Sequence, residues 1–139
     1  MMIKSEPKPT ILIVDDNEIN KNLLTEYLSG NYNLLTASNG VEAMDLIEEK
    51  LDEISLVLLD IVMPHLNGFE MLDEMNKNGW IETLPVVIIS SEGYADFKNK
   101  AYLYNVYNFI TKPFTYEEVM ACVERILDCT PKKLPQDPA

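Results

Sequence analysis

Short apolar runs alternate along the chain with segments in which apolar residues recur every three or four positions. The runs have the length and composition of buried β-strands, whereas the recurring segments have the period of amphipathic helices. Strands are predicted at Ile11–Val14, Tyr32–Ala37, Leu56–Leu59, Val86–Ile89 and Asn108–Thr111. Their alternation with helical segments predicts an α/β fold, in which a doubly wound five-stranded parallel sheet carries helices on both faces.

The predicted helices differ in how clearly their apolar positions repeat. The fifth is the clearest, because Thr115–Glu118 is spaced as a capping box and the apolar residues of Val119–Leu127 keep helical spacing. Asn39–Glu42 is spaced in the same way at the start of the second helix, which is predicted to bury Val41. The third helix is predicted to cover Phe69–Lys77, before an Asn-Gly pair that ends it.

The first and fourth helices carry less regular patterns. The first follows Asp16 and is predicted to bury an apolar stripe that begins at Ile19 and ends at Leu28. The fourth is predicted over Tyr94–Tyr104 and is the weakest, because most of its residues are polar or charged. Its strongly apolar positions are only Phe97, Ala101 and Leu103.

Size and composition favour one domain and exclude two kinds of partner. With 139 residues, 47% of them hydrophobic, the chain can build one ordinary core, which we expect over residues 10–129. Residues 1–9 are expected to form a flexible segment, and residues 130–139 a linker or disordered tail. The net charge of −12 would repel a phosphate backbone, which excludes direct nucleic-acid binding. No apolar run is long enough to span a membrane. Cys122 and Cys129 are too far apart on one predicted helix to form a disulfide, and we expect them to be reduced in a cytoplasmic location.

Polar side chains gather where the predicted strands end. Asp15 and Asp16 follow the first strand, Asp60 follows the third, and Ser90 and Lys112 follow the fourth and fifth. In a parallel sheet these ends meet at one edge, where ligands collect. Carboxylates packed together repel one another unless a cation lies between them, and all-oxygen ligands favour Mg²⁺ or Mn²⁺. Mg²⁺ keeps positions open for phosphate oxygens, so the pattern favours phosphoryl transfer.

The same residues occur within longer motifs. These motifs are Val14-Asp15-Asp16, Asp60-Ile61-Val62-Met63-Pro64 with Asn67-Gly68, Ile89-Ser90 and Lys112-Pro113-Phe114. In this order and at these separations, they resemble the receiver domain of bacterial two-component response regulators. The resemblance covers about Thr10–Cys129, and it implies a flavodoxin-like sheet with the strand order 2-1-3-4-5.

The resemblance also implies a phosphorylation and metal site. Asp60 would accept a phosphoryl group from a phosphohistidine on a sensor histidine kinase or a phosphotransfer protein. Mg²⁺ would be bound directly by Asp16 and Asp60, through water by Asp15, and by the backbone carbonyl of Val62. The protein would then be a signalling domain rather than an enzyme, limited to its own phosphorylation and slow autodephosphorylation.

Other residues would detect the phosphoryl group once it is attached. Ser90, Lys112 and the Ser91 backbone N–H would contact its oxygens, and the Phe109 ring would turn inward when Ser90 moves. One expected partner is a second copy of the chain, bound through the fourth helix, fifth strand and fifth helix, because tyrosines cluster there. A C-terminal output domain is another, since the chain is either a stand-alone receiver or the amino-terminal part of a longer regulator.

Two positions depart from the family pattern, and a third position is a candidate for an unusual peptide bond. Asn105 stands in a turn where the family more often has a Gly-Ala pair, and it is predicted to close the fourth helix in the left-handed conformation. Ser90 replaces a commoner threonine and keeps the hydroxyl. Lys112-Pro113 is a candidate for a cis peptide bond that points the lysine inward.

Three alternative functions share parts of this pattern. A phosphatase of the haloacid dehalogenase type needs a second acid two residues after its nucleophile, but Asn17 follows Asp15 at that spacing. A flavodoxin-like FMN carrier needs a loop of small residues that cradles phosphate after the first strand, where this chain has acids. A receiver-shaped interaction module that is never phosphorylated stays open, although the intact set of acids, hydroxyl and lysine argues against it.

Overall fold

Strands and helices alternate along the described part of the chain, which comprises residues 8–61, 67–91 and 95–129 of the computed structural model. The strands are β1 (Thr10–Val14), β2 (Asn33–Ala37), β3 (Ile54–Leu59), β4 (Val86–Ser90) and β5 (Asn108–Thr111). The helices are α1 (Glu18–Leu28), α2 (Gly40–Lys50), α3 (Gly68–Lys77), α4 (Ala95–Leu103) and α5 (Tyr116–Cys129). A short 3₁₀ helix that was not predicted, η1 (Trp80–Glu82), precedes β4.

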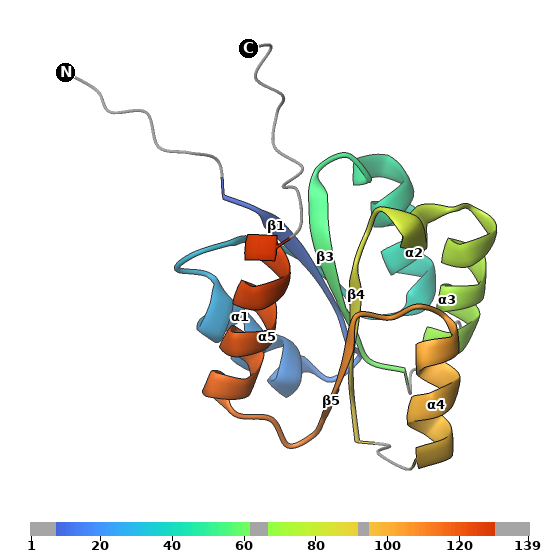
Figure 1. Cartoon of the computed structure of the whole chain (residues 1–139). Helices are drawn as coiled ribbons and strands as arrows, with labels where there is room; N and C mark the ends of the chain where they lie inside the picture. Colours follow the sequence, from blue (N-terminus) through green and yellow to red (C-terminus); the bar gives the residue numbers. More distant parts are fainter. Residues whose placement is uncertain (1–7, 62–66, 92–94, 130–139) are drawn as a thin grey trace.

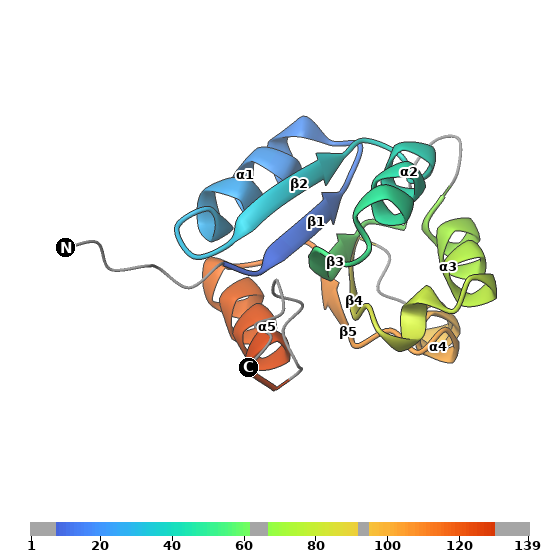
Figure 2. The same ribbon diagram turned by 90° about the horizontal axis from the view of Figure 1, so that it is seen from above.

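The five strands form one parallel sheet in the order β2-β1-β3-β4-β5. Helices α1 and α5 cover one face, and α2, α3 and α4 lie on the other (Figures 1 and 2). The predicted fold class and strand order are confirmed. At one edge of the sheet β1 begins and α5 ends, whereas the strands end at the opposite edge (Figure 1). Within the described ranges, no helix combines the length and the hydropathy needed to cross a bilayer.

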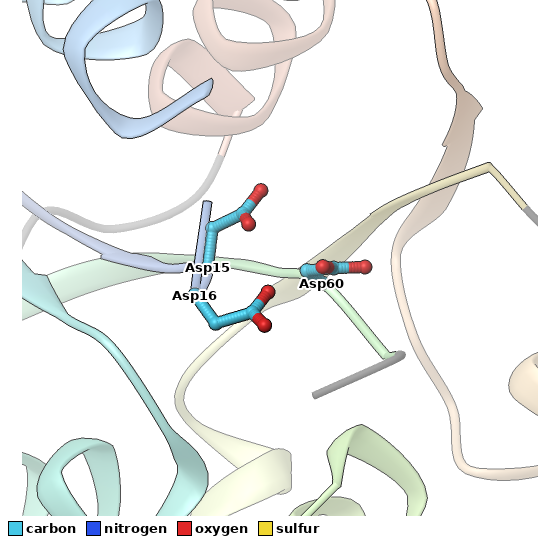
Figure 3. A group of neighbouring side chains, drawn as sticks. All are labelled: Asp15, Asp16 and Asp60. Carbon is cyan, nitrogen blue, oxygen red and sulfur yellow. The ribbon is translucent and has the colours of Figure 1, made fainter. Parts of the chain in front are cut away.

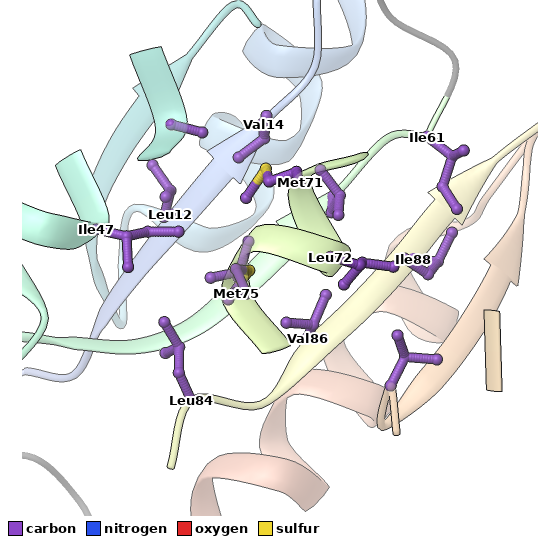
Figure 4. Close-up of a cluster of buried hydrophobic side chains, with 14 of the residues drawn as sticks. Leu12, Val14, Ile47, Ile61, Met71, Leu72, Met75, Leu84, Val86 and Ile88 are labelled. Carbon is purple, nitrogen blue, oxygen red and sulfur yellow. The ribbon is translucent and has the colours of Figure 1, made fainter. Parts of the chain in front are cut away.

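Alternate residues of the central strands face different helices. In β1, Ile11 and Ile13 belong to the core under α1 and α5, whereas Leu12 and Val14 belong to the core under α2 and α3. Figure 4 shows the second core, to which α3 contributes Met71, Leu72 and Met75. All six residues of β3 are buried, because helices cover both of its faces. This explains the continuous apolar run Leu56–Leu59 that ends directly before Asp60.

Three apolar side chains of the helices are exposed, and two of them, Ile19 and Val41, were predicted to be buried. Their exposed fractions are 76% for Ile19, 53% for Val41 and 82% for Leu103. Each lies two positions from a buried residue of its own helix, namely Lys21, Ala43 and Ala101. Two positions turn an α-helix by about 200°, so these side chains face away from the sheet. The predictions that Ile19 and Val41 are buried were therefore wrong.

The predicted capping boxes are formed to different degrees. At the start of α5, Thr115 Oγ1 accepts from the Glu118 N–H at 3.1 Å, and Glu118 Oε1 accepts from the Thr115 N–H at 3.0 Å. In α2, Asn39 Oδ1 accepts from the Glu42 N–H at 2.9 Å, but Glu42 Oε1 accepts from Ser38 N–H at 3.1 Å. The second helix therefore has the predicted cap, with the return hydrogen bond shifted by one residue.

Both backbone predictions at the turns around β5 are confirmed. Asn105 has φ 63°, the left-handed conformation that asparagine tolerates better than other non-glycine residues. The Lys112–Pro113 peptide bond is cis. These two positions lie in the turns before and after β5.

Candidate functional site

The register of the sheet brings three acids together. Val14 pairs with Leu59, so the residues that follow, Asp15 and Asp60, leave neighbouring strands at the same level. The Asp60 N–H donates to the Val14 carbonyl at 2.8 Å, which extends this pairing by one residue. Asp16 comes next, and one carboxylate oxygen from each of the three acids lies within 4.8 Å of the other two (Figure 3).

The three carboxylates differ in their surroundings. Asp15 and Asp60 are buried, with 2% and 6% of their surface exposed. Asp15 Oδ1 accepts from the Asn17 N–H at 2.8 Å, and its Oδ2 accepts from Lys112 Nζ at 3.0 Å. Asp16 is exposed. Protein donors thus already engage both oxygens of Asp15, whereas Asp16 is an exposed residue.

Lys112 brings a positive charge to two of these acids. Its Nζ lies 3.0 Å from Asp15 Oδ2 and 3.5 Å from Asp60 Oδ2, and its side chain is 17% exposed. The sheet sets this position, because Ser90 pairs with Thr111 and the Lys112 N–H donates to the Ser90 carbonyl at 2.8 Å. Ser90 itself is fully buried at the end of β4. Because little water reaches these charges, their attraction is only weakly screened.

The donor set fits a hard divalent cation. All three acids offer oxygens, which are the ligands that Mg²⁺ prefers. Ligands about 2.0–2.1 Å from the ion lie up to ~4.2 Å apart on opposite sides of it, close to the 4.8 Å spread of the acids. Three carboxylates beside one ammonium also leave an excess of negative charge that a divalent cation would neutralise.

The other predicted site positions are placed as follows. Ser91 follows β4 directly and is exposed. Phe109 lies in β5 with 9% of its surface exposed, and Lys98 Nζ from α4 lies 5.5 Å from the centroid of its ring. Val62 lies outside the described residues, so its role as a metal ligand stays a prediction.

The sequence interpretation gave no role to Asn17, which supports the site from the start of α1. Its side chain accepts from the Asn20 N–H at 2.9 Å as the N-cap of α1, while its own N–H donates to Asp15. The capping bond fixes the direction in which α1 leaves β1, and the second bond orients the Asp15 carboxylate. An asparagine directly after strand-end acids and before a helical stripe was the available signal.

Gly68 is a second residue to which the sequence interpretation gave no role. Its N–H donates to the Ile61 carbonyl at 2.8 Å, which ties the start of α3 to the residue after Asp60. A Cβ at this position would lie 2.6 Å from Ile61 Cα and 3.1 Å from the Asp60 carbonyl oxygen. Both atoms belong to the backbone and cannot rotate aside. The absence of a side chain therefore lets α3 begin directly against the strand end that carries Asp60.

The Gly68→Ala variant should separate α3 from this strand end. We expect its free energy of unfolding to fall by about 1–3 kcal/mol, the usual cost of forcing extra atoms into a packed region. Urea unfolding measures this loss. Gly30→Ala is the matched control, because a Cβ at Gly30 meets nothing within 4 Å. Equal stability of the two variants would show that the loop accommodates the methyl group.

Comparison with known proteins places this geometry in a family. The model of the response regulator receiver domain matches residues 11–124. Response regulator Rre1 of Synechocystis is 29% identical over 85% of this chain and 51% of its own length. The chain spans about half the length of several curated relatives, and only 8% of a hybrid signal transduction histidine kinase from Dictyostelium discoideum.

Solved structures agree with this match. The non-phosphorylated receiver domain of HemR from Leptospira biflexa superposes with a TM-score of 0.80 at 29% identity, covering 89% of this chain and 98% of that one. The CheX–CheY–BeF3–Mg complex from Borrelia burgdorferi also has a TM-score of 0.80, at 27% identity, covering 87% and 90% of the two chains. With its strand order, its three acids and its lysine in place, the chain belongs to the response regulator receiver domain family.

Proposed function

We propose that the domain accepts a phosphoryl group on Asp60 from a phosphohistidine of a sensor histidine kinase or phosphotransfer protein, and then switches a partner. The observation that carries this proposal is the Asp60 carboxylate at a strand end, with Lys112 Nζ at 3.5 Å and two further acids within 4.8 Å. The relative from Borrelia burgdorferi was solved with BeF3 and Mg, which supports the same site chemistry here.

The transfer step follows from the position of Asp60. A carboxylate oxygen of Asp60 attacks phosphorus, the P–O bond forms, and the P–N bond breaks with its electron pair returning to the imidazole of the donor. Asp16 and Asp60 would hold Mg²⁺ directly, Asp15 through water, and the Val62 carbonyl would add a ligand. When bound, this ion neutralises charge on the phosphoryl oxygens.

Lys112 and Ser90 are the groups that would respond to the new charge. Phosphorylation adds about −1.5 to −2 charges, and each charge-assisted hydrogen bond contributes roughly 1.5–3 kcal/mol. Lys112 already pairs with Asp15 at 3.0 Å, so its gain on phosphorylation is a difference between two ion pairs and is smaller than a new bond. The Ser90 hydroxyl, which is buried at the end of β4, and the Ser91 N–H would add further contacts to the phosphoryl oxygens, and Phe109 would follow Ser90.

Intact mass spectrometry after incubation with acetyl phosphate and Mg²⁺ tests the proposal. We expect one phosphoryl group per chain, lost when EDTA replaces the metal, and peptide mapping should place it on Asp60. Absence of any adduct under conditions in which a known receiver domain is phosphorylated would instead favour an interaction module that is never phosphorylated.

We also propose self-association through α4, β5 and α5 after phosphorylation. Three large side chains of this face are exposed, with fractions of 44% for Tyr102, 82% for Leu103 and 49% for Tyr107. Light scattering with and without beryllium fluoride should give a higher mass with it, and Leu103→Glu should prevent the increase. Ile19→Glu is the matched control, because Ile19 is 76% exposed on α1, which is not part of the proposed interface. Equal masses in both states would contradict the dimer.

A further inference from the structure

The described side chains of helix α4 make an unusual set of contacts. Among its described side chains, residues 98–103, only Ala101 is buried, and an alanine buries little apolar surface. Two lysines make the other prominent contacts. Lys98 Nζ lies 5.5 Å from the centroid of the Phe109 ring in β5, and Lys100 Nζ lies 4.4 Å from the centroid of the Phe69 ring in α3.

The two lysines reach opposite flanks of the helix. They are two residues apart, which turns an α-helix by about 200°, and α4 lies beside both β5 and α3 (Figures 1 and 2). The α3 flank has further contacts, because the Phe69 and Tyr104 rings lie 6.0 Å apart. A hydrogen bond with Asp73 also raises the pKa of the Tyr104 hydroxyl. On the β5 flank, Lys98 contacts Phe109, the residue whose ring we propose to move on phosphorylation.

The contact of Lys98 favours one position of the Phe109 ring. The face of an aromatic ring is negative and attracts an ammonium group within about 6 Å of its centroid. The ring is 9% exposed here, so the ammonium covers it in a buried position. Moving the ring outward would break this contact and expose the ring to water. Lys98 therefore stabilises the buried position relative to an exposed one.

We propose that Lys98 is a positioning residue that holds the Phe109 ring in its buried position and thereby favours the phosphorylated state of the domain. This inference rests on the proposed function, in which the ring turns inward when Asp60 is phosphorylated. Lys100 has no such role, because it contacts Phe69. The family resemblance alone does not predict this role, which depends on the lysine at position 98 of this chain.

Fluorine NMR of protein labelled with 4-fluorophenylalanine tests the ring position directly. The chain has four phenylalanines, and Phe109→Leu identifies the Phe109 signal. In the absence of Mg²⁺ and beryllium fluoride, Lys98→Met should shift the equilibrium of this ring toward the exposed position by about two- to fivefold. Lys98→Arg should restore the wild-type signal, because a guanidinium makes the same contact. Lys100→Met is the matched control and should leave the Phe109 signal unchanged.

Binding of beryllium fluoride with Mg²⁺ tests the link to phosphorylation. Lys98→Met should weaken this binding about two- to fivefold, and it should have no effect when Phe109 is already replaced by leucine. A lysine that merely stabilised α4 would weaken binding equally in both backgrounds, which would overturn the inference. An unchanged Phe109 signal in Lys98→Met would overturn it as well. If wild-type protein binds no beryllium fluoride, the proposed function fails, and the ring signal alone decides whether Lys98 positions Phe109.

Discussion

The Asp60→Asn variant is expected to incorporate no phosphate from acetyl phosphate and Mg²⁺. Asparagine has nearly the same shape as aspartate, but its neutral amide lacks the carboxylate oxygen that would attack phosphorus. The fold should be retained, because the substitution removes one of three neighbouring negative charges and keeps the Asp60 backbone bond to Val14. Intact mass before and after treatment measures the effect.

Asp52→Asn is the matched control for this prediction. Asp52 is an exposed acid just before β3, at the opposite edge of the sheet, so its replacement should leave phosphate incorporation unchanged. A phosphate adduct of wild-type size in Asp60→Asn would mean that another acid is the acceptor. Asp16 would then be the first candidate, because its carboxylate is exposed.

The Asp16→Ala variant is expected to lose Mg²⁺ binding near neutral pH. Replacing groups that merely support a metal ligand typically costs 10–100-fold in affinity, and loss of a direct ligand should cost at least about 100-fold. Lys112→Ala should behave differently, since removing an ammonium 3.0–3.5 Å from two of the acids removes repulsion toward the ion. We expect this variant to bind Mg²⁺ at least as tightly as wild type.

Isothermal titration calorimetry is the appropriate measurement of these affinities. Trp80 is a poor reporter, because η1 precedes β4 and therefore lies near the edge where the strands begin, far from the acids. Wild-type affinity in Asp16→Ala would exclude Asp16 as a ligand. Weaker binding in Lys112→Ala would mean that the lysine organises the acids rather than repelling the metal.

Most of the sheet and of the acid cluster could be predicted from the sequence, for a shared physical reason. Strands buried on both faces, such as β3, must be continuous apolar runs, so their ends are easily located. In a parallel sheet the residues after Val14 and Leu59 must lie at one edge, which brings Asp15 and Asp60 together. The Lys112 contacts required more, namely the resemblance to receiver domains.

The helices were harder to predict, because a helical surface has no sharp boundary between its buried and exposed sides. Ile19 and Leu103 are apolar and close to buried positions in sequence, yet they point away from the sheet. The lysine contacts of α4 were missed for a different reason. A lysine in a helical pattern is normally assigned to the solvent-facing side. Only the structure reveals that Lys98 and Lys100 lie over aromatic rings.

The placement of the two ends of the domain has a practical consequence for binding assays. The start of β1 and the end of α5 lie at the edge of the sheet opposite the acids (Figure 1). A biotin tag or fluorescent protein joined before Thr10 or after Cys129 would therefore project away from Asp60. Such fusions can be immobilised on a sensor chip while the acidic edge stays accessible to a phosphohistidine-bearing protein in solution, so that its association rate can be measured without chemical labelling.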